Sequence, residues 1–407
     1  MYIYIHRFVN SSFCYLPSFS NQSFISIKKK VFFFFLSSSL SLIMTSPSEK
    51  TYSKFYHVEI GIIILFLCLT VPSLIILTLI YRQQSHPPPP PSILKPTFQR
   101  FSLTEYPQAR CMDQTIASYY IRRATNNHSR WLIYFDGGWF CYSKQSCEFR
   151  RRYSPDFISS NVFNHEKFST GIFSSFKHFN ILYAPYCSSD LWSGSSNETH
   201  SHGYNIFHAI FHHRNYFPDA KQILFTGYSA GGLGLLLNLP DLLPKFSPQI
   251  DLRLILDSAW FIDQSDNPNG ISTITQGMQY WNTQISSQCQ FKQRYKCLFG
   301  SQAIQFLPSK LKIFIIQSLF DLTQLQFDHS NDFSVKLREN LIESRHRLSI
   351  FAPSCYQHGY LFRSLWSKYS INQRTLGYYL HMWLKHNKHL FILDENFQSS
   401  SCPLNDE

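Results

Sequence analysis

The segment Gly227-Tyr228-Ser229-Ala230-Gly231-Gly232 follows directly on the apolar run Ile223-Leu224-Phe225-Thr226. A G-x-S-x-G pentapeptide between a strand and a helix places its serine on a tight, strained turn with the hydroxyl exposed. The flanking glycines let neighbouring backbone pass close by. The apolar segment 233–238 predicts a helix whose N-terminal N–H groups face the serine and can stabilise an oxyanion. The same letters are also typical of a glycine-rich turn with an inactive serine, so the rest of the chain decides.

Apolar runs of strand length recur along the chain at intervals that leave room for helices. Continuous apolar runs are typical of parallel strands buried on both faces, and their alternation with helical segments indicates βαβ units. Residues 101–407 therefore predict one α/β domain, a mostly parallel sheet flanked by helices as in the α/β-hydrolases. Ligands should bind beyond the carboxyl ends of the strands. The predicted strands are 131–135, 181–183, 223–225, 252–256 and 313–316.

A nucleophilic serine needs a base within hydrogen-bond reach and an acid that orients the base. In α/β-hydrolases these residues follow one another as serine, acid and histidine. Asp257 and Asp321 both follow predicted strands, and the later strand favours Asp321. His358 follows the short apolar run 348–351 and is our candidate for the base, although an ordinary surface histidine would look the same. The other histidines after Asp321 are His329, His346, His381, His386 and His389.

An oxyanion hole needs a backbone N–H from the residue after the nucleophile and another from an early strand loop. Ala230 fits the first role. The segment Asp136-Gly137-Gly138-Trp139 follows the first predicted strand, and Gly138 and Trp139 fit the second. A plain Gly-Gly turn is the alternative at this position.

The N-terminal quarter of the chain differs in composition from the rest. The apolar run 58–81 matches the roughly 20 residues of a membrane helix, and the proline run Pro87–Pro91 after it forms a semi-rigid stalk. We expect a low-complexity cytoplasmic segment at 1–57, with Met44 as the working start, a single transmembrane signal anchor at 58–81 and a stalk at 82–100. The catalytic domain, 101–407, completes this order.

Eight of the ten cysteines lie beyond the predicted span, an even number that is typical of a disulfide framework in an oxidising compartment. The same region holds glycosylation sequons at Asn127 and Asn197. A lumenal or extracellular catalytic domain follows, at the Golgi or the cell surface, with release by cleavage as the alternative to retention.

The formal net charge of +12 is scattered along the chain. The triplets Lys28–Lys30 and Arg150–Arg152 lie in no nucleic-acid-binding module, so we expect no nucleic-acid partner. A basic surface suits an anionic membrane or acidic, sulfated glycans. The sequence has no C-x-x-C pair and no H-E-x-x-H motif, and we expect neither a metal nor another cofactor.

Several blocks of this sequence together resemble the Notum / pectin acetylesterase family, in the family's order and across about residues 105–390. The segments Gly-Gly-Trp-Phe-Cys, Cys-Ser-Ser-Asp-x-Trp-Ser-Gly and Leu-Phe-Asp-x-x-Gln-Leu look like the animal branch rather than the plant branch. The resemblance implies a carboxylesterase that removes palmitoleate from a serine of Wnt proteins. It supports Ser229, Asp321 and His358 as a triad, with Gly138, Trp139 and Ala230 at the oxyanion hole, and makes Asp257 structural. The blocks are Asp136–Cys141, Pro185–Gly194, Gly227–Gly232, Asp257–Asp263, Gln317–Leu325 and His358 with Arg363–Trp366.

The resemblance also implies an acyl pocket and a set of disulfides. Where Phe327 and Phe362 stand, the family typically has smaller side chains, which predicts a shallower pocket for shorter acyl groups. Closeness in sequence supports only the Cys141–Cys147 disulfide. The pocket residues are Trp139, Phe140, Phe261, Ile274, Leu298, Phe299, Phe327 and Phe362, and the other pairings are Cys111–Cys187, Cys289–Cys297 and Cys355–Cys402.

Two alternatives to a lipid esterase stay open. One is an O-acetylesterase that acts on a glycan, as the plant branch of the family does. The other is a catalytically inactive, membrane-tethered binding protein with a basic surface. An intact serine, acid and histidine set argues against the second.

Overall fold

The computed structural model describes residues 98–125, 129–162, 168, 170–263, 268–326 and 332–396. These all belong to a compact unit that spans Leu94–Glu407. The predicted cytoplasmic segment, the transmembrane anchor at 58–81 and most of the stalk lie outside the described residues. Within those residues, no helix has both the length and the apolar composition that a membrane span needs.

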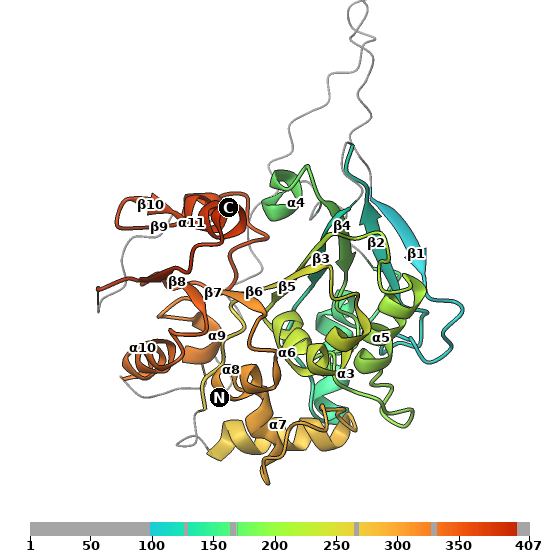
Figure 1. Ribbon diagram of the computed structural model, residues 1–407. Helices are drawn as coiled ribbons and strands as arrows, with labels where there is room; N and C mark the ends of the chain where they lie inside the picture. Colours follow the sequence, from blue (N-terminus) through green and yellow to red (C-terminus); the bar gives the residue numbers. More distant parts are fainter. Residues whose placement is uncertain are drawn as a thin grey trace, which may run out of the picture. The chain divides into compact units, whose positions relative to one another are not determined.

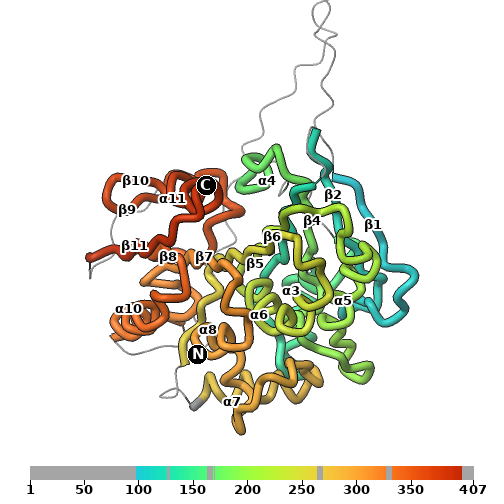
Figure 2. The backbone as a smooth tube through the Cα atoms, in the orientation of Figure 1, coloured from blue at the N-terminus to red at the C-terminus, as the bar shows by residue number. Residues whose placement is uncertain are grey.

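The centre of the unit is a nine-stranded sheet in the order β1-β2-β4-β3-β5-β6-β7-β8-β11 (Figure 1). The strands β1 and β2 pair antiparallel, and β2 also runs antiparallel to β4, whereas every later pairing is parallel. Figure 2 shows the resulting path, with the early strands at one edge and β8 and β11 at the other. The strands are β1 Gln99–Ser102, β2 Ser118–Arg122, β3 Arg130–Phe135, β4 Asn180–Ala184, β5 Gln222–Tyr228, β6 Asp251–Asp257, β7 Lys312–Ile316, β8 Ser349–Ala352 and β11 Phe391–Leu393.

Helices cover both faces of the sheet. One face packs on α5, α6, α8 and α10, and the other on α4 and α11. Alternate residues of β3 belong to the two cores, with Ile133 in the first and Leu132 in the second. The helices are α3 Lys144–Tyr153, α4 Gly171–Ser175, α5 Gly203–His213, α6 Ala230–Leu242, α7 Pro268–Tyr280, α8 Gly300–Ala303, α9 Leu322–Leu325, α10 Phe333–Glu343 and α11 Leu376–His386. A small hairpin, β9 Ser370–Ile371 with β10 Arg374–Thr375, precedes α11.

The predicted mostly parallel sheet flanked by helices is confirmed. Each of the five apolar runs is a strand, β3, β4, β5, β6 and β7, and the run at 348–351 contributes β8. These strands are almost wholly buried, because helices cover them on both sides. The strands β1, β2 and β11 were not predicted from the sequence. β1 and β11 form the two edges of the sheet and are exposed or partly buried, so no continuous apolar run marks them, whereas β2 lies beside β1 and is buried.

Three of the four expected disulfides are present: Cys111–Cys187, Cys141–Cys147 and Cys289–Cys297. Cys355 is also disulfide-bonded, and its expected partner Cys402 lies outside the described residues. Such bonds form and persist in oxidising compartments, as expected for a secreted or lumenal domain.

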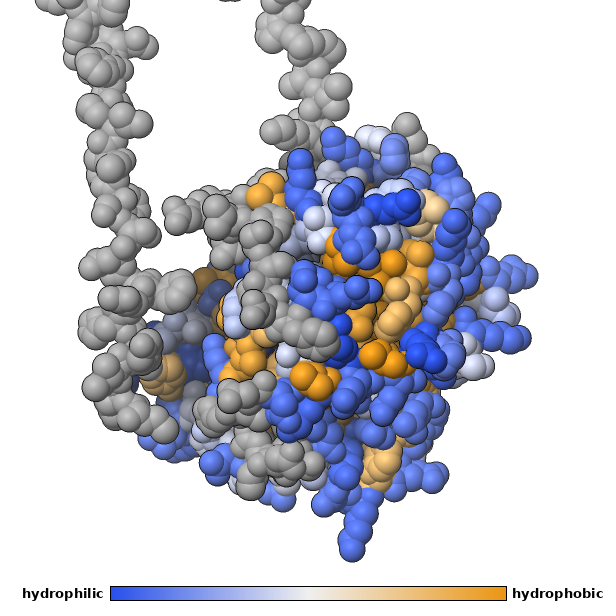
Figure 3. All heavy atoms as spheres, turned by 90° about the vertical axis from the view of Figure 1, so that its left-hand side faces the viewer, coloured by the Kyte–Doolittle hydropathy of each residue, from blue (hydrophilic) through white to orange (hydrophobic). Residues whose placement is uncertain are grey.

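Of the two glycosylation sequons, the one at Asn197 is exposed in a turn, whereas Asn127 lies outside the described residues. Seen from the side of the C-terminal elements, hydrophilic residues dominate the surface and hydrophobic residues form patches among them (Figure 3).

Candidate active site

Ser229 stands between the end of β5 and the start of α6, at the carboxyl end of the parallel strands. Its backbone has φ 49° and ψ −118°, a left-handed conformation that costs a residue with a side chain on the order of 1–3 kcal/mol. Two neighbouring glycines allow this turn. A Cβ on Gly231 would lie 2.1 Å from the carbonyl oxygen of Phe135, and one on Gly232 would lie 2.2 Å from Cβ of Ala259. The G-x-S-x-G segment is therefore a nucleophile elbow in shape.

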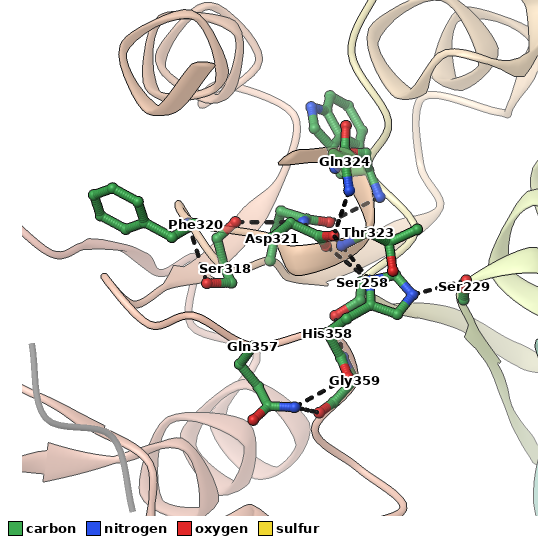
Figure 4. Close-up of polar contacts among 12 residues, drawn as sticks. Ser229, Ser258, Ser318, Phe320, Asp321, Thr323, Gln324, Gln357, His358 and Gly359 are labelled. Carbon is green, nitrogen blue, oxygen red and sulfur yellow. Dashed lines mark hydrogen bonds and ion pairs between the residues drawn. The ribbon is translucent and has the colours of Figure 1, made fainter. Parts of the chain in front are cut away.

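His358 links Ser229 to Asp321 (Figure 4). Its Nε2 lies 2.9 Å from the Ser229 hydroxyl oxygen. Its Nδ1 lies 2.9 and 3.0 Å from the two carboxylate oxygens of Asp321. With the proton on Nδ1, the ring donates to the carboxylate and its Nε2 accepts from the serine hydroxyl. This is the relation of nucleophile, base and orienting acid that serine hydrolysis requires.

The Asp321 carboxylate is completely buried and surrounded by donors. It caps α9, where its Oδ1 accepts from the backbone N–H groups of Thr323 and Gln324 at 2.9 and 3.1 Å. The side-chain amide of Gln317 donates to Oδ2 at 2.7 Å. Each of these partners donates a hydrogen bond and so supports the carboxylate as the acceptor toward His358. The ring is held in one tautomer and one orientation as a result.

Asp257, the competing candidate acid, contacts the histidine loop rather than the histidine ring. It ends β6 and is completely buried. Its side chain accepts from the backbone N–H groups of Tyr360, at 2.9 Å, and Leu361, at 2.7 Å. Ser258 accepts from the N–H of Gly359 at 2.8 Å. Burial raises the pKa of Asp257 to about 6, although the N–H donors of Leu361 and Tyr360 act in the opposite direction.

The glycine loop after β3 lies against the elbow. A Cβ on Gly137 would stand 2.9 Å from Cβ of Ser229 and 3.1 Å from the backbone nitrogen of Ala230, so only glycine allows this approach. Trp139 has φ 64°, a second left-handed residue beside the serine. The two segments expected to supply oxyanion donors are thus neighbours in space.

An apolar cavity begins at Ser229. The serine, Ala230 and Trp139 all line it, and the space free of protein atoms amounts to about 860 Å³, its open mouth included. The structure brings six of the eight expected acyl-pocket residues to this cavity: Trp139, Phe140, Phe261, Ile274, Leu298 and Phe299.

The other two expected pocket residues do not lie there in the described structure. Phe362 is not part of the wall, because its ring packs instead on Tyr228, with 4.8 Å between ring centroids. Phe327 lies outside the described residues. Phe362 therefore does not make the pocket shallower, contrary to the expectation from the sequence.

About half of the residues that line the cavity were not predicted from the sequence. The first turn of α7 contributes Gly270 and Ile271, and α6 contributes Leu233. A helix that faces a cavity has the same apolar spacing as one that faces the core, so periodicity alone does not separate the two. The remaining residues of the wall are Leu191, Ile262, Thr273 and Gln324.

Within the described ranges, no group of three or more His, Cys, Asp or Glu side chains is arranged to hold a metal ion.

Known proteins resemble this chain over most of the described unit. The model of the pectinacetylesterase family matches residues 97–336. The palmitoleoyl-protein carboxylesterase NOTUM of Schmidtea mediterranea is 33% identical over 72% of this chain and 64% of its own length. The human protein of that name is 30% identical over 72% of this chain and 66% of its own length, and the Drosophila melanogaster one is 26% identical over 67% and 46%. The chain thus spans less than two thirds of the length of these relatives. Since the family match covers more than half of the chain, the chain belongs to the pectinacetylesterase family.

Proposed function

We propose that the chain is a serine carboxylesterase that removes an O-linked palmitoleate from Wnt-type proteins and so silences their signal. The observation that carries this proposal is the position of Ser229, whose hydroxyl is hydrogen-bonded to His358 and which lines an apolar cavity. A long monounsaturated chain gains about 0.8 kcal/mol for each methylene that it buries. The relatives named palmitoleoyl-protein carboxylesterase support this choice of substrate.

The first half of the reaction forms an acyl-enzyme. The Ser229 oxygen attacks the ester carbonyl carbon while Nε2 of His358 takes the hydroxyl proton. The Asp321 carboxylate stabilises the imidazolium that results. The carbonyl oxygen becomes an oxyanion, which accepts hydrogen bonds from backbone N–H groups of Ala230 and the Gly138–Trp139 segment. The tetrahedral intermediate then collapses, His358 returns the proton to the departing serine oxygen of the substrate, and the palmitoleoyl group remains on Ser229.

The second half regenerates the enzyme. A water molecule gives a proton to His358 and its oxygen attacks the acyl carbon, forming a second oxyanion. Collapse of that intermediate breaks the bond to the Ser229 oxygen, which recovers its proton from His358. Palmitoleic acid is released. No cofactor takes part in either half.

The decisive experiment uses a Wnt peptide palmitoleoylated on serine and follows its mass. The wild-type domain should remove the acyl mass and the Ser229→Ala variant should not. Ser247→Ala is the matched control, because Ser247 is an exposed serine away from the site. Retention of the acyl group by the wild type, or its loss in Ser229→Ala, would overturn the proposal.

A glycan O-acetylesterase is the second candidate, favoured by the description of the matching family. p-Nitrophenyl esters of increasing chain length separate the two. A lipid esterase should retain or gain kcat/KM from butyrate to octanoate and beyond, because each methylene enters the cavity. Activity on the acetate ester that is lost by the octanoate ester would favour the glycan O-acetylesterase instead. Binding without turnover of any ester would favour the inactive binding protein.

We further propose that the segment 58–81 anchors the enzyme in the membrane with its catalytic domain in the Golgi lumen or at the cell surface. The disulfides support the compartment. Cell fractionation with N-terminal sequencing tests the anchor. A mature protein that begins after residue 81 would show release by cleavage, and one that retains residues 1–43 would exclude Met44 as the start.

A further inference from the structure

Arg150 differs from the two arginines beside it in the basic triplet Arg150–Arg152. Arg151 and Arg152 are exposed, whereas Arg150 is partly buried. Its guanidinium donates to the carbonyl oxygen of Gly138 and, through Nε, to the hydroxyl of Ser189 at 2.6 Å. One member of the triplet is thus committed to the glycine loop beside Ser229.

The contact with the Gly138 carbonyl fixes the orientation of a whole peptide unit. The Gly138–Trp139 peptide is trans, so its C=O and its N–H point to opposite sides. With Arg150 on the carbonyl side, the N–H of Trp139 points away from the guanidinium. Trp139 is one of the residues that line the cavity with Ser229 and Ala230, and the backbone of the same loop at Gly137 lies against Ser229 and the Ala230 nitrogen.

The charge of Arg150 is directed at neutral oxygens. Among the ion pairs between described residues, none includes Arg150, although Asp156 acts on it at longer range. An arginine side chain stays protonated in proteins, so the positive charge persists at the Gly138 carbonyl. A cation on a carbonyl oxygen polarises the peptide and strengthens its N–H as a donor.

Several contacts keep Arg150 in place. It lies on α3, and this helix begins with a capping box at Ser143. The Cys141–Cys147 disulfide links the helix to the glycine loop. Its guanidinium lies over the ring of Phe157, 4.8 Å from the ring centroid. A Cβ on Gly138 would stand 2.4 Å from the same ring, so only glycine lets the carbonyl reach Arg150.

We propose that Arg150 is a positioning residue for the oxyanion hole, which holds and polarises the Gly138–Trp139 peptide so that the Trp139 N–H donates to the oxyanion. This inference rests on the proposed esterase function. Arg150 acts through a backbone group, and it touches neither the substrate nor Ser229. Its effect should therefore fall on the charged transition state and leave the binding of the neutral acyl chain unchanged.

Arg150→Met removes both hydrogen bonds and the charge while keeping a long side chain. Loss of one oxyanion donor lowers kcat by about 10²- to 10³-fold in serine hydrolysis. We expect a fall in kcat of about 10²-fold on a soluble ester, with KM unchanged. Arg150→Lys keeps the charge and one donor, so it should recover about tenfold of that loss. Arg151→Met, the exposed neighbour on the same helix, is the matched control and should keep wild-type kcat.

Two inhibitors separate positioning from general damage. An alkylboronic acid forms a tetrahedral adduct with the serine and places an oxygen in the oxyanion hole, whereas the matching long-chain alcohol occupies only the cavity. In Arg150→Met the boronic acid should lose affinity by the same factor as kcat, and the alcohol should bind as it does to wild type. Thermal unfolding shows whether the variant is folded. If Arg150→Met unfolds, Arg150→Lys carries the test, with a fall in kcat of about tenfold at constant KM.

The inference is overturned if Arg150→Met matches Arg151→Met in kcat, or if the alcohol and the boronic acid lose affinity equally in a folded variant. Failure of the proposed function looks different, because the wild type would then hydrolyse no ester, or Ser229→Ala would retain activity. An active wild type that loses all activity in Ser229→Ala and is unaffected by Arg150→Met would refute this inference alone.

Discussion

Two aspartates look alike in the sequence and differ in the groups that they bind: Asp257 ends β6, and Asp321 follows β7 and caps α9. Asp257 and Asp321 are both completely buried at the carboxyl edge of the sheet. Asp321 accepts a hydrogen bond from Nδ1 of His358. Asp257 accepts hydrogen bonds from the backbone N–H groups of Tyr360 and Leu361, two and three residues after the histidine. One carboxylate orients the ring and the other orients the chain that carries the ring.

This difference teaches that the position of a histidine depends on two separate anchors. The side-chain anchor sets the tautomer and the ring angle. The backbone anchor sets where the ring begins. Asp257 also contacts the nucleophile through its main chain, because the N–H of Ser229 donates to its backbone carbonyl at 2.9 Å. Substitutions at the two sites should therefore damage turnover in different ways.

The largest effect should come from Asp321→Asn. The asparagine side chain has one acceptor oxygen and one NH₂ donor in place of two acceptor oxygens. When the NH₂ group faces His358, it favours the wrong tautomer of the ring. The same change in a serine protease lowers kcat by about 10⁴-fold with the geometry intact. Steady-state kinetics on a soluble ester measure it, and thermal unfolding should stay near wild type. A smaller loss than that of Asp257→Asn would reverse the assignment of the two acids.

The next effect should come from Asp257→Ala. This change leaves the N–H groups of Tyr360 and Leu361 buried without their acceptor, at a cost of about 1–3 kcal/mol each. We expect a marked fall in the denaturation midpoint and a loss of kcat of about 10-fold to 100-fold from the displaced loop. Wild-type stability in the variant would mean that the loop does not depend on this anchor.

A third prediction concerns pH. Burial raises the pKa of Asp257 to about 6, so the folded protein keeps a proton that the unfolded chain releases at lower pH. This group therefore stabilises the fold at low pH, and its contribution is lost as the pH rises through about 6. Urea unfolding at pH 4.5 and 7 should show that the stability of wild type relative to Asp257→Asn falls on the order of 2 kcal/mol between the two. Asp257→Asn keeps every other titratable group. An unchanged difference between the two proteins would show that the carboxylate is already ionised at pH 4.5.

The smallest effect should come from Ser258→Ala, which removes the acceptor of the Gly359 N–H and the long hydrogen bond that the Ser258 hydroxyl donates to Asp257. We expect kcat to fall a few-fold at most, with a loss of about 1 kcal/mol in stability. Urea unfolding and ester kinetics on the same preparation measure both. A loss as large as that of Asp257→Ala would show that Ser258, rather than the carboxylate, anchors the loop.

Residue order and strand ends were enough to predict the elbow, the buried parallel strands and the preference for Asp321. Each of these depends on local pattern or on the direction of parallel strands. Phe362 was placed in the pocket on resemblance alone, and in the structure its ring packs on Tyr228 instead. The role of Asp257 as a loop anchor also had no signal, since its partners are backbone groups that every residue has.

Because of the Cys141–Cys147 disulfide, the activity of the newly made protein depends on the compartment in which it folds. This disulfide joins the end of the glycine segment to α3, the helix that carries Arg150. A chain made where thiols stay reduced would lack this link. We expect such material to be folded and poorly active, and to gain activity on oxidation. Passage through an oxidising compartment would then be the step at which the newly made protein becomes an efficient hydrolase.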